Sequence, residues 1–301
     1  MENKRAKPVW LRIRHRESPN HKIVEATLRR LNLNTVCSEA CCPNQTECFS
    51  RKTATFMIMG TICTRNCRFC NVRFGEPLEL DAEEPVNIAK AVKELGLGYV
   101  VITSVTRDDL PDGGAGDFAK VIAEVRRYSP NTLIEVLIPD FVGSKYSLKI
   151  VTDALPDVIS HNVETVSELY QIARPQAVYQ RSLNLLKNIK LLNPNIRTKS
   201  GFMVGLGETE NQVYELFDDL YEACCEFLTI GQYLAPSKEH LPVFEYVEPC
   251  QFEKYELIAK QKGFEFVAAA PLVRSSFRAG EAFGEGDVHA YNHKRKNYHG
   301  K

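Results

Sequence analysis

The feature that most constrains the fold is an alternation, beginning after residue 55, of apolar β-rich runs with amphipathic stretches. The amphipathic stretches have apolar side chains at positions i, i+3, i+4 and i+7, which is the period of an α-helix. Strands that are apolar throughout and are followed by helices indicate a parallel sheet buried on both faces. The six expected strands span residues 56–63, 98–104, 132–139, 157–164, 198–207 and 227–234.

Six β/α units fit either an open doubly wound sheet or an incomplete β/α barrel, and the spacing alone does not choose between them. In both topologies the carboxyl ends of the strands form the functional edge. The segments that follow the strands are polar or rich in cysteine, and include CTRNCRFC, TSVTRDD, HNVET and GLGE. We therefore expect the chemistry at that edge.

The flanking segments have no long Gly/Ser or Pro-rich linker to separate them from the repeated units. We expect residues 1–54 and 265–301 to pack as extensions onto a barrel formed by residues 55–264.

The composition excludes several classes of protein. The chain has 301 residues, of which 44% are hydrophobic, enough for a sizeable core. Its 38 basic side chains equal its 38 acidic ones, so the net charge does not recruit nucleic acid or a membrane surface. We expect a cytoplasmic protein, because the sequence has neither the apolar core of a secretory signal nor a run of about 20 apolar residues.

The ten cysteines are unlike a disulfide framework, because seven of them lie between residues 37 and 70. In a reducing compartment such clustering indicates metal ligation or catalysis. Cys63, Cys67 and Cys70 have the spacing C-x3-C-x2-C directly after an expected strand. Three thiolates suit a four-iron cubane whose remaining iron is open, whereas a structural zinc site needs a fourth ligand from elsewhere.

This triple, with Phe69 before its last cysteine, resembles the signature of the radical S-adenosylmethionine enzymes. The resemblance implies a partial barrel of six β/α units and a 4Fe-4S cluster. In that superfamily S-adenosylmethionine chelates the free iron, and the reduced cluster cleaves it to methionine and a 5'-deoxyadenosyl radical. The resemblance also implies that Phe69 adjoins the cofactor.

A second triple lies upstream in CSEACCPNQTEC, where Cys37, Cys42 and Cys48 are spaced C-x4-C-x5-C. This pattern resembles the auxiliary cluster motif of the lipoyl synthases. The similarity continues through RKTATFMIMG, VVITSVTRDDLPDGGAGDFA, TKSGFMVGLGET and PLVRSSFRAG. Cys41 would give a different spacing, C-x3-C-x6-C, and we favour Cys42 because it reproduces the family spacing and precedes Pro43.

In lipoyl synthases the fourth ligand of the auxiliary cluster is a serine in a C-terminal Arg-Ser-Ser-Tyr motif. The motif here reads RSSF, so the resemblance implies Ser276 as that ligand. A serinate oxygen is a hard ligand among soft thiolates, so its iron should be the most easily detached. Phe277 replaces the usual tyrosine, which removes any hydrogen bond that the tyrosine hydroxyl makes.

The resemblance implies insertion of two sulfur atoms at carbons 6 and 8 of an octanoyl group on a carrier-protein lysine, with the auxiliary 4Fe-4S cluster as sulfur donor. Those carbons have no acidic proton, so a radical from a cofactor is necessary. The implied partners are octanoylated lipoyl-carrier domains (2-oxoacid dehydrogenase E2 subunits and the glycine cleavage H protein), a ferredoxin or flavodoxin type reductant, and an iron-sulfur cluster carrier.

Four further positions are expected to contact S-adenosylmethionine. Thr103 and Ser104 end the second expected strand, where the superfamily commonly contacts the methionyl group. Asn162 and Glu164 end the fourth, where ribose contacts are usual. Arg174 and Lys199 remain open between a ligand-binding and a structural role. Similarly, the DDLPDGGAG segment, which begins at residue 108, is either a divalent-metal site or a turn that shapes the edge.

Two alternative functions remain. A sulfur-inserting enzyme similar to biotin synthase would share the first cysteine triple, but not the second triple or the RSSF segment. A non-enzymatic electron carrier or zinc protein would not need six β/α units, and two-cluster ferredoxins supply four cysteines to each cluster.

Overall fold

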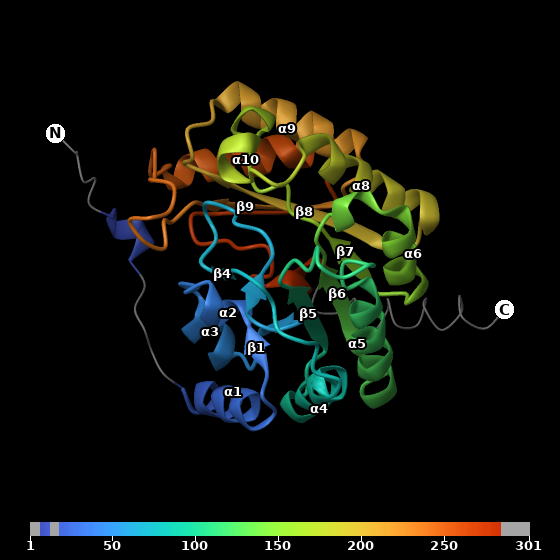
Figure 1. Ribbon diagram of the computed structural model, residues 1–301. Helices are drawn as coiled ribbons and strands as arrows, with labels where there is room; N and C mark the ends of the chain where they lie inside the picture. Colours follow the sequence, from blue (N-terminus) through green and yellow to red (C-terminus); the bar gives the residue numbers. More distant parts are fainter. Residues whose placement is uncertain (1–6, 13–17, 284–301) are drawn as a thin grey trace.

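A curved sheet is the main element of the computed structural model, which describes residues 7–12 and 18–283. Its eight strands have the order β1-β2-β5-β6-β7-β8-β9-β10. β1 (Asn34–Thr35) is antiparallel to β2, and the other neighbours are parallel. The parallel strands are β2 (Thr55–Ile58), β5 (Tyr99–Ser104), β6 (Leu133–Leu137), β7 (Val158–Ser160), β8 (Arg197–Val204), β9 (Phe227–Gln232) and β10 (Phe266–Ala269). In Figure 1 the strands form an open arc, which confirms the expected partial barrel.

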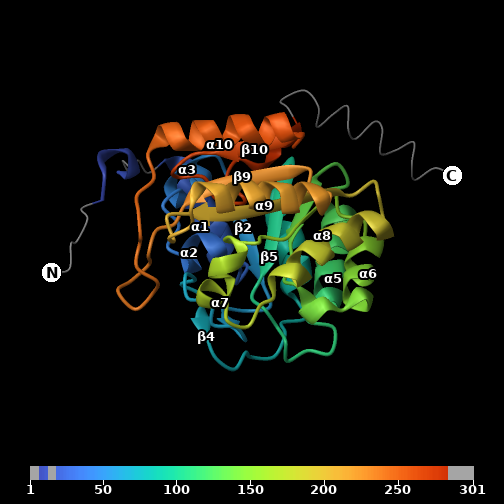
Figure 2. The same ribbon diagram turned by 90° about the horizontal axis from the view of Figure 1, so that it is seen from above.

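Helices cover the outside of the arc, as the amphipathic pattern predicts (Figure 1). They are α4 (Glu84–Leu95), α5 (Ala115–Tyr128), α6 (Lys145–Asp153), α8 (Tyr179–Leu192), α9 (Glu210–Glu222) and α10 (Pro249–Lys262). Figure 2 shows α9 and α10 along one side of the sheet and α5, α6 and α8 along another. Within the described residues, no helix has the length and apolar character needed to cross a membrane.

Short helices and turns complete the chain. Ahead of the parallel strands, α1 (Pro19–Arg30) contacts both α3 (Gln45–Ser50) and α4, and α2 (Val36–Glu39) contacts β1 and β2. The remaining elements are η1 (Val9–Leu11), η2 (Phe141–Gly143), η3 (Ser167–Leu169), α7 (Tyr170–Ala173) and η4 (Ala279–Phe283).

The strand expected at residues 56–63 is broken in two. β2 ends at Ile58, because Met59 and Gly60 adopt left-handed φ angles of 67° and 89°. The Met59 N–H donates to the Glu84 carboxylate at 2.8 Å, so the turn has a partner of its own. Gly114 admits the Met59 side chain, whose sulfur would lie 2.3 Å from a Cβ at that position. The turn directs the cysteine-bearing segment off the sheet, where β3 (Ile62–Cys63) pairs with β4 (Arg73–Phe74).

Three strands were not expected from the sequence, of which β4 is the two-residue partner of β3. β10 adds a further parallel strand beside β9, and its four residues are too short a run to distinguish from a loop. β1 has two residues and is defined by its pairing with β2.

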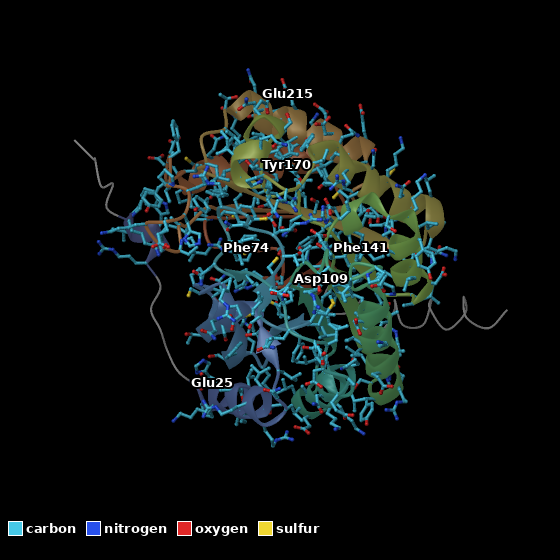
Figure 3. All side chains as sticks on the ribbon, in the orientation of Figure 1. Glu25, Phe74, Asp109, Phe141, Tyr170 and Glu215 are labelled. Atoms are coloured by element: carbon cyan, nitrogen blue, oxygen red, sulfur yellow. The ribbon has the colours of Figure 1, made fainter. Side chains whose placement is uncertain are left out.

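The loops at the carboxyl ends of the strands gather on one side of the arc. Figure 3 shows Phe74, which ends β4, and Asp109 and Phe141, which follow β5 and β6, near the middle of the view. Glu25 and Glu215 lie at the outside, on α1 and α9.

The opposite end of the arc is covered by the C-terminal η4. Phe283 is buried, and its ring centroid lies 5.7 Å from that of Tyr99 and 5.8 Å from that of Phe227. Together with Leu133, these aromatic residues form a small apolar cluster at the amino ends of β5, β6 and β9. The last described turn of the chain is thus anchored beneath the barrel.

Candidate active site with two cysteine clusters

The first cysteine triple lies on the loop after β3. The Cys63 sulfur accepts hydrogen bonds from the N–H groups of Arg65 (3.4 Å) and Thr106 (3.3 Å). Burial raises the pKa of Cys70 to about 12, and the neighbouring thiolates of Cys67 and Cys63 contribute to the rise. The three thiols therefore lie close together, and a metal centre that binds them must displace protons.

Contacts from distant segments fix the conformation of this loop. The Asn66 N–H donates to the Gln176 side-chain oxygen at 2.7 Å. His240 Nε2 lies 3.0 Å from the Cys70 carbonyl oxygen, and its Nδ1 lies 2.8 Å from the Ser237 hydroxyl. Because a carbonyl can only accept, Nε2 is the nitrogen that donates. His240 is thus a scaffold residue for the loop.

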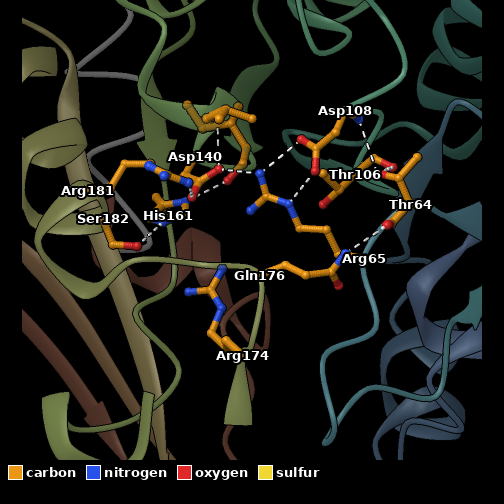
Figure 4. Close-up of polar contacts among 12 residues, drawn as sticks. Thr64, Arg65, Thr106, Asp108, Asp140, His161, Arg174, Gln176, Arg181 and Ser182 are labelled. Carbon is orange, nitrogen blue, oxygen red and sulfur yellow. Dashed lines mark hydrogen bonds and ion pairs between the residues drawn. The ribbon is translucent and has the colours of Figure 1, made fainter. Parts of the chain in front are cut away.

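Arg65 is the centre of a buried ion-pair network on the same loop (Figure 4). Its guanidinium donates to both oxygens of Asp108, at 2.6 and 2.9 Å, and to Asp140 at 2.6 Å. Burial alone would raise the pKa of Asp140, but the hydrogen bond and charge of Arg65 lower it to about 2. Asp109 pairs with Arg107 at 2.7 Å. Two of the three aspartates of the DDLPDGGAG segment are therefore neutralised by arginines, and Asp112 accepts from the N–H groups of Gly114 and Gly116, which favours a turn that shapes the edge.

The second cysteine triple lies on and between α2 and α3. Burial raises the pKa of Cys37 to about 11 and that of Cys48 to about 12, and in both cases the Cys42 thiolate contributes. Cys41 is exposed and adopts a left-handed φ of 48°. Its sulfur lies 3.5 Å from the Asn71 amide nitrogen. The structure thus groups Cys42, and not its neighbour, with Cys37 and Cys48.

Ser276, near the carboxyl end of the chain, lies at the same cavity as the second cysteine triple. Its hydroxyl oxygen accepts a hydrogen bond from the Thr55 hydroxyl at 2.8 Å. A cavity of about 700 Å³ is lined by Ser276 together with Cys37, Cys42 and Cys48. In the described part of the chain, no three His, Cys, Asp or Glu side chains converge on the position of a single metal ion.

Phe277 lines the cavity beside this serine. The guanidinium carbon of Arg278 lies 5.3 Å from the centre of the Phe277 ring. The residue that replaces the usual tyrosine therefore has an aromatic–cation contact, which does not require a hydroxyl.

Backbone contacts hold the RSSF segment against the sheet and the N-terminal helices. The Gln232 N–H donates to the Pro271 carbonyl at 3.2 Å, and the Asn44 side chain donates to the Leu272 carbonyl at 2.6 Å. A Cβ at Gly231 would lie 2.1 Å from the Val273 carbonyl oxygen. Glycine is therefore required at this point of β9, because the chain passes too close for any side chain.

Unsatisfied polar atoms lie on the edge beside the first triple. In the described residues, the buried Ser104 Oγ, Asn162 Oδ1 and Arg174 Nε have no hydrogen-bond partner. The Thr103 hydroxyl donates to the Leu137 carbonyl at 3.1 Å, so its lone pairs alone remain for a ligand. Buried polar groups are normally paired, so such a group of atoms indicates a binding site.

Glu164 lies next to these atoms and to the first triple. Desolvation raises the pKa of its carboxyl, and the charge of Arg174 opposes the rise. Burial raises the pKa of Cys67, while Arg174 lowers it and Glu164 raises it, so all three groups are neighbours. Phe69 is half-buried on the same loop. The predicted positions that follow β7 therefore border the first triple, and Thr106, two residues beyond the end of β5, donates to the Cys63 sulfur.

Lys199, whose role was left open, and His161 both have structural partners. The Lys199 ammonium lies 2.9 and 3.0 Å from the Glu135 carboxylate oxygens, and both side chains are buried. His161 Nδ1 lies 2.8 Å from the Ile138 carbonyl, and Nε2 lies 2.9 Å from the Ser182 hydroxyl. Burial lowers the pKa of His161 to about 4, so its ring is neutral.

Several residues of this site were not singled out from the sequence. Arg65 stands within the C-x3-C spacing and Arg274 opens the RSSF segment, so their positions in the motifs could have identified them. Nothing local marks Thr55 or Gly231, because their roles depend on contacts with a segment more than 40 residues away.

The fold and the first triple define the class of protein. Residues 57–220 match the family model of the radical SAM superfamily. Among solved structures, SuiB of Streptococcus suis bound to S-adenosylmethionine has a similar fold, with a TM-score of 0.56 and 13% identity over 82% of this chain and 60% of that chain. The chain is therefore a radical SAM protein.

Closer relatives identify the family within that class. A lipoyl synthase of Caldanaerobacter subterraneus subsp. tengcongensis is 57% identical over 91% of this chain and 95% of the relative. A lipoyl synthase of Alkaliphilus metalliredigens is 55% identical over 93% of this chain and 97% of the relative. This chain belongs to the lipoyl synthase family, whose members are sulfur-inserting radical SAM enzymes, and the resemblance inferred from its sequence is confirmed.

Proposed function

We propose that this chain inserts sulfur at carbons 6 and 8 of an octanoyl group on a carrier-protein lysine, and so forms the lipoyl cofactor. One observation carries the proposal: three cysteines near the amino end and a serine near the carboxyl end line a single cavity. The proposed ligands of the auxiliary 4Fe-4S cluster are Cys37, Cys42, Cys48 and Ser276. The proposed ligands of the cluster that binds S-adenosylmethionine are Cys63, Cys67 and Cys70.

The residues around the first triple fit S-adenosylmethionine. The ligand has an ammonium, a carboxylate and ribose hydroxyls, and the edge has unpaired donor and acceptor atoms on Ser104, Asn162 and Arg174. We assign Thr103 and Ser104 to the methionyl group and Asn162 and Glu164 to the ribose. Phe69 supplies apolar surface on the cluster loop.

The donor set around the cavity fits a second cluster. Thiolates are the usual ligands of iron-sulfur clusters, and three of them line the space. Ser276 must lose its proton to bind iron through oxygen. The hydrogen bond from the Thr55 hydroxyl stabilises the resulting alkoxide, because a hydrogen bond to the charged form favours ionisation.

When bound, these groups supply a radical that removes hydrogen from unactivated carbon and a sulfide that replaces it. The chain's own residues provide positioning. Arg65 and Asp140 fix the first loop from inside the barrel, and Gln176 and His240 fix it from neighbouring loops. A loop held at several points keeps its ligands within the narrow tolerance that catalysis requires.

In this proposal the chain has three functional parts. Residues 1–54 supply the auxiliary cysteines, residues 55–264 form the radical SAM barrel, and residues 265–301 supply the serine. Residues 284–301 lie outside the described part of the chain.

We propose octanoylated lipoyl-carrier domains as substrates, a ferredoxin or flavodoxin type protein as reductant, and an iron-sulfur cluster carrier for rebuilding the auxiliary cluster. The ten free cysteines are suited to a reducing compartment such as the cytoplasm.

Anaerobic reconstitution followed by turnover with an octanoylated carrier peptide tests the proposal. The full chain should hold about eight irons with matching sulfide, as two cubanes require, and mass spectrometry should detect the added sulfur. Replacing Cys63, Cys67 or Cys70 by alanine should abolish formation of 5'-deoxyadenosine. Replacing an auxiliary cysteine should leave that cleavage and remove the thiolated product. Identical behaviour of the two sets of variants would contradict the division of roles.

A further inference from the structure

Arg274 is a half-buried cation without a carboxylate partner among the described residues. Its guanidinium lines the cavity with the auxiliary cysteines. The hydrogen bond that it makes, at 2.7 Å, goes to the carbonyl of the preceding residue, Val273. Its electrostatic neighbour in the described structure is Cys42, one of the auxiliary cysteines. An arginine in such a position costs free energy unless an anion compensates it.

Four other charged groups around the cavity compensate one another, while Lys52, which also lines it, has no ion pair among the described residues. Glu47 pairs with Arg51 at 3.3 Å and with Arg278 at 3.1 Å. Glu281 lies 4.0 Å from Arg51 and 3.6 Å from Arg278. The exposed fractions of these four side chains lie between 42% and 52%, so water also screens their charges. Arg274 lines the same cavity and is outside this network.

The backbone, and not a counter-ion, sets the position of the guanidinium. A Cβ at Gly231 would lie 3.3 Å from Arg274 Nη1, so the side chain passes directly over this glycine. The close approach of β9 to the Val273 carbonyl fixes the start of the side chain. A cation held in place without its anion is preorganised for a negatively charged occupant.

We propose that Arg274 is the counter-charge of the auxiliary cluster and raises the reduction potential of that cluster. The inference rests on the proposed function and deepens it. A four-iron core held by three thiolates and one alkoxide has a net charge of about −2. A fixed positive charge nearby stabilises the more negative, reduced form, and the effect is strong in a site with little water. Arg274 acts on the cluster through its positive charge, and it does not ligate iron.

The test is the reduction potential of the auxiliary cluster in the full chain with Cys63, Cys67 and Cys70 replaced by alanine, so that this cluster is measured alone. In that background Arg274→Gln should lower the one-electron equilibrium constant for reduction at least tenfold, which is 59 mV. Arg274→Lys, which keeps the charge, should restore most of the potential. If Arg274→Gln assembles no cluster while Arg274→Lys does, the requirement for a cation is equally supported.

Arg278→Gln is the matched control, because it removes an arginine from the same cavity lining that is 42% exposed and already paired. The equilibrium constant for reduction in this variant should stay within about threefold of the parent value, since an exposed charge is screened. Equal potentials in the parent and Arg274→Gln, equal shifts in Arg274→Gln and Arg278→Gln, or failure of Arg274→Lys to restore the potential would overturn the inference. A parent chain without iron in this background would instead refute the proposed auxiliary cluster, and the inference with it.

Discussion

Gly231→Ala isolates the contact that brings the C-terminal segment to the cavity. The new Cβ would lie 2.1 Å from the Val273 carbonyl oxygen, and real Cβ contacts under 3.0 Å are essentially never seen. The backbone at Val273 must therefore retreat by about 1 Å or more. Such overpacking costs about 1–3 kcal/mol of stability. Ser276 lies three residues further along the same segment, so its oxygen moves away from the cysteines.

Iron analysis after anaerobic reconstitution measures the consequence. We expect the iron content of Gly231→Ala to fall from about eight toward about four per chain, because the auxiliary site alone is disturbed. The variant should still form 5'-deoxyadenosine and should release no thiolated peptide. Urea unfolding should report the lost stability as a lower transition midpoint.

Gly98→Ala is the control for this prediction. Gly98 lines the same cavity, but a Cβ there would meet no heavy atom within 4 Å. This variant should keep the iron content and activity of the parent. Full iron and normal product from Gly231→Ala, or equal losses from Gly98→Ala, would refute the reasoning.

Other parts of the structure give three further predictions. Phe283→Ala should cost about 3 kcal/mol in urea unfolding, because it empties the cluster beneath the barrel, while Tyr146→Ala, at a residue 72% exposed, should cost under about 0.5 kcal/mol. His161 has its pKa lowered to about 4, so the unfolded chain binds a proton that the folded chain does not. Its contribution of about 3 kcal/mol is present above pH 6.5 and is lost as the pH falls toward 4, and His161→Asn should flatten that part of the stability profile. Arg65→Lys cannot keep the two-pronged contact with Asp108, so it should slow 5'-deoxyadenosine formation roughly tenfold or more and leave auxiliary iron unchanged. If Arg65→Lys formed 5'-deoxyadenosine at the parent rate, the prediction for Arg65 would be wrong. If His161→Asn left the pH dependence of stability unchanged, the prediction for His161 would be wrong.

Local patterns in the sequence were sufficient for much of the fold. The expected strands at 98–104 and 227–234 agree closely with β5 and β9, because uninterrupted apolar residues specify a strand buried on both faces. The expected strand at 56–63 is interrupted after Ile58. That break depends on the Glu84 carboxylate and on the space at Gly114, which are remote in sequence.

The candidate site likewise combines features that local sequence patterns predict with features that depend on contacts remote in sequence. Cysteine spacing is local, so the grouping of each triple could be predicted from the sequence alone. The choice of Cys42 over Cys41 came from family resemblance, and the structure adds its physical reason, since Cys41 faces solvent. The pairing of Ser276 with Thr55 and the unpaired charge of Arg274 arise from long-range contacts, which no local pattern encodes.

Isotopic labelling of the sulfide tests the central claim most directly. The full chain is reconstituted anaerobically with heavy sulfide, freed of unbound sulfide, and given unlabelled S-adenosylmethionine, reductant and octanoylated carrier peptide for a single turnover. If the cavity that Cys37, Cys42, Cys48 and Ser276 line holds the sulfur donor, mass spectrometry should find heavy sulfur at both modified carbons of the peptide. Product with sulfur of natural isotopic composition, formed while the protein retains its label, would contradict the account.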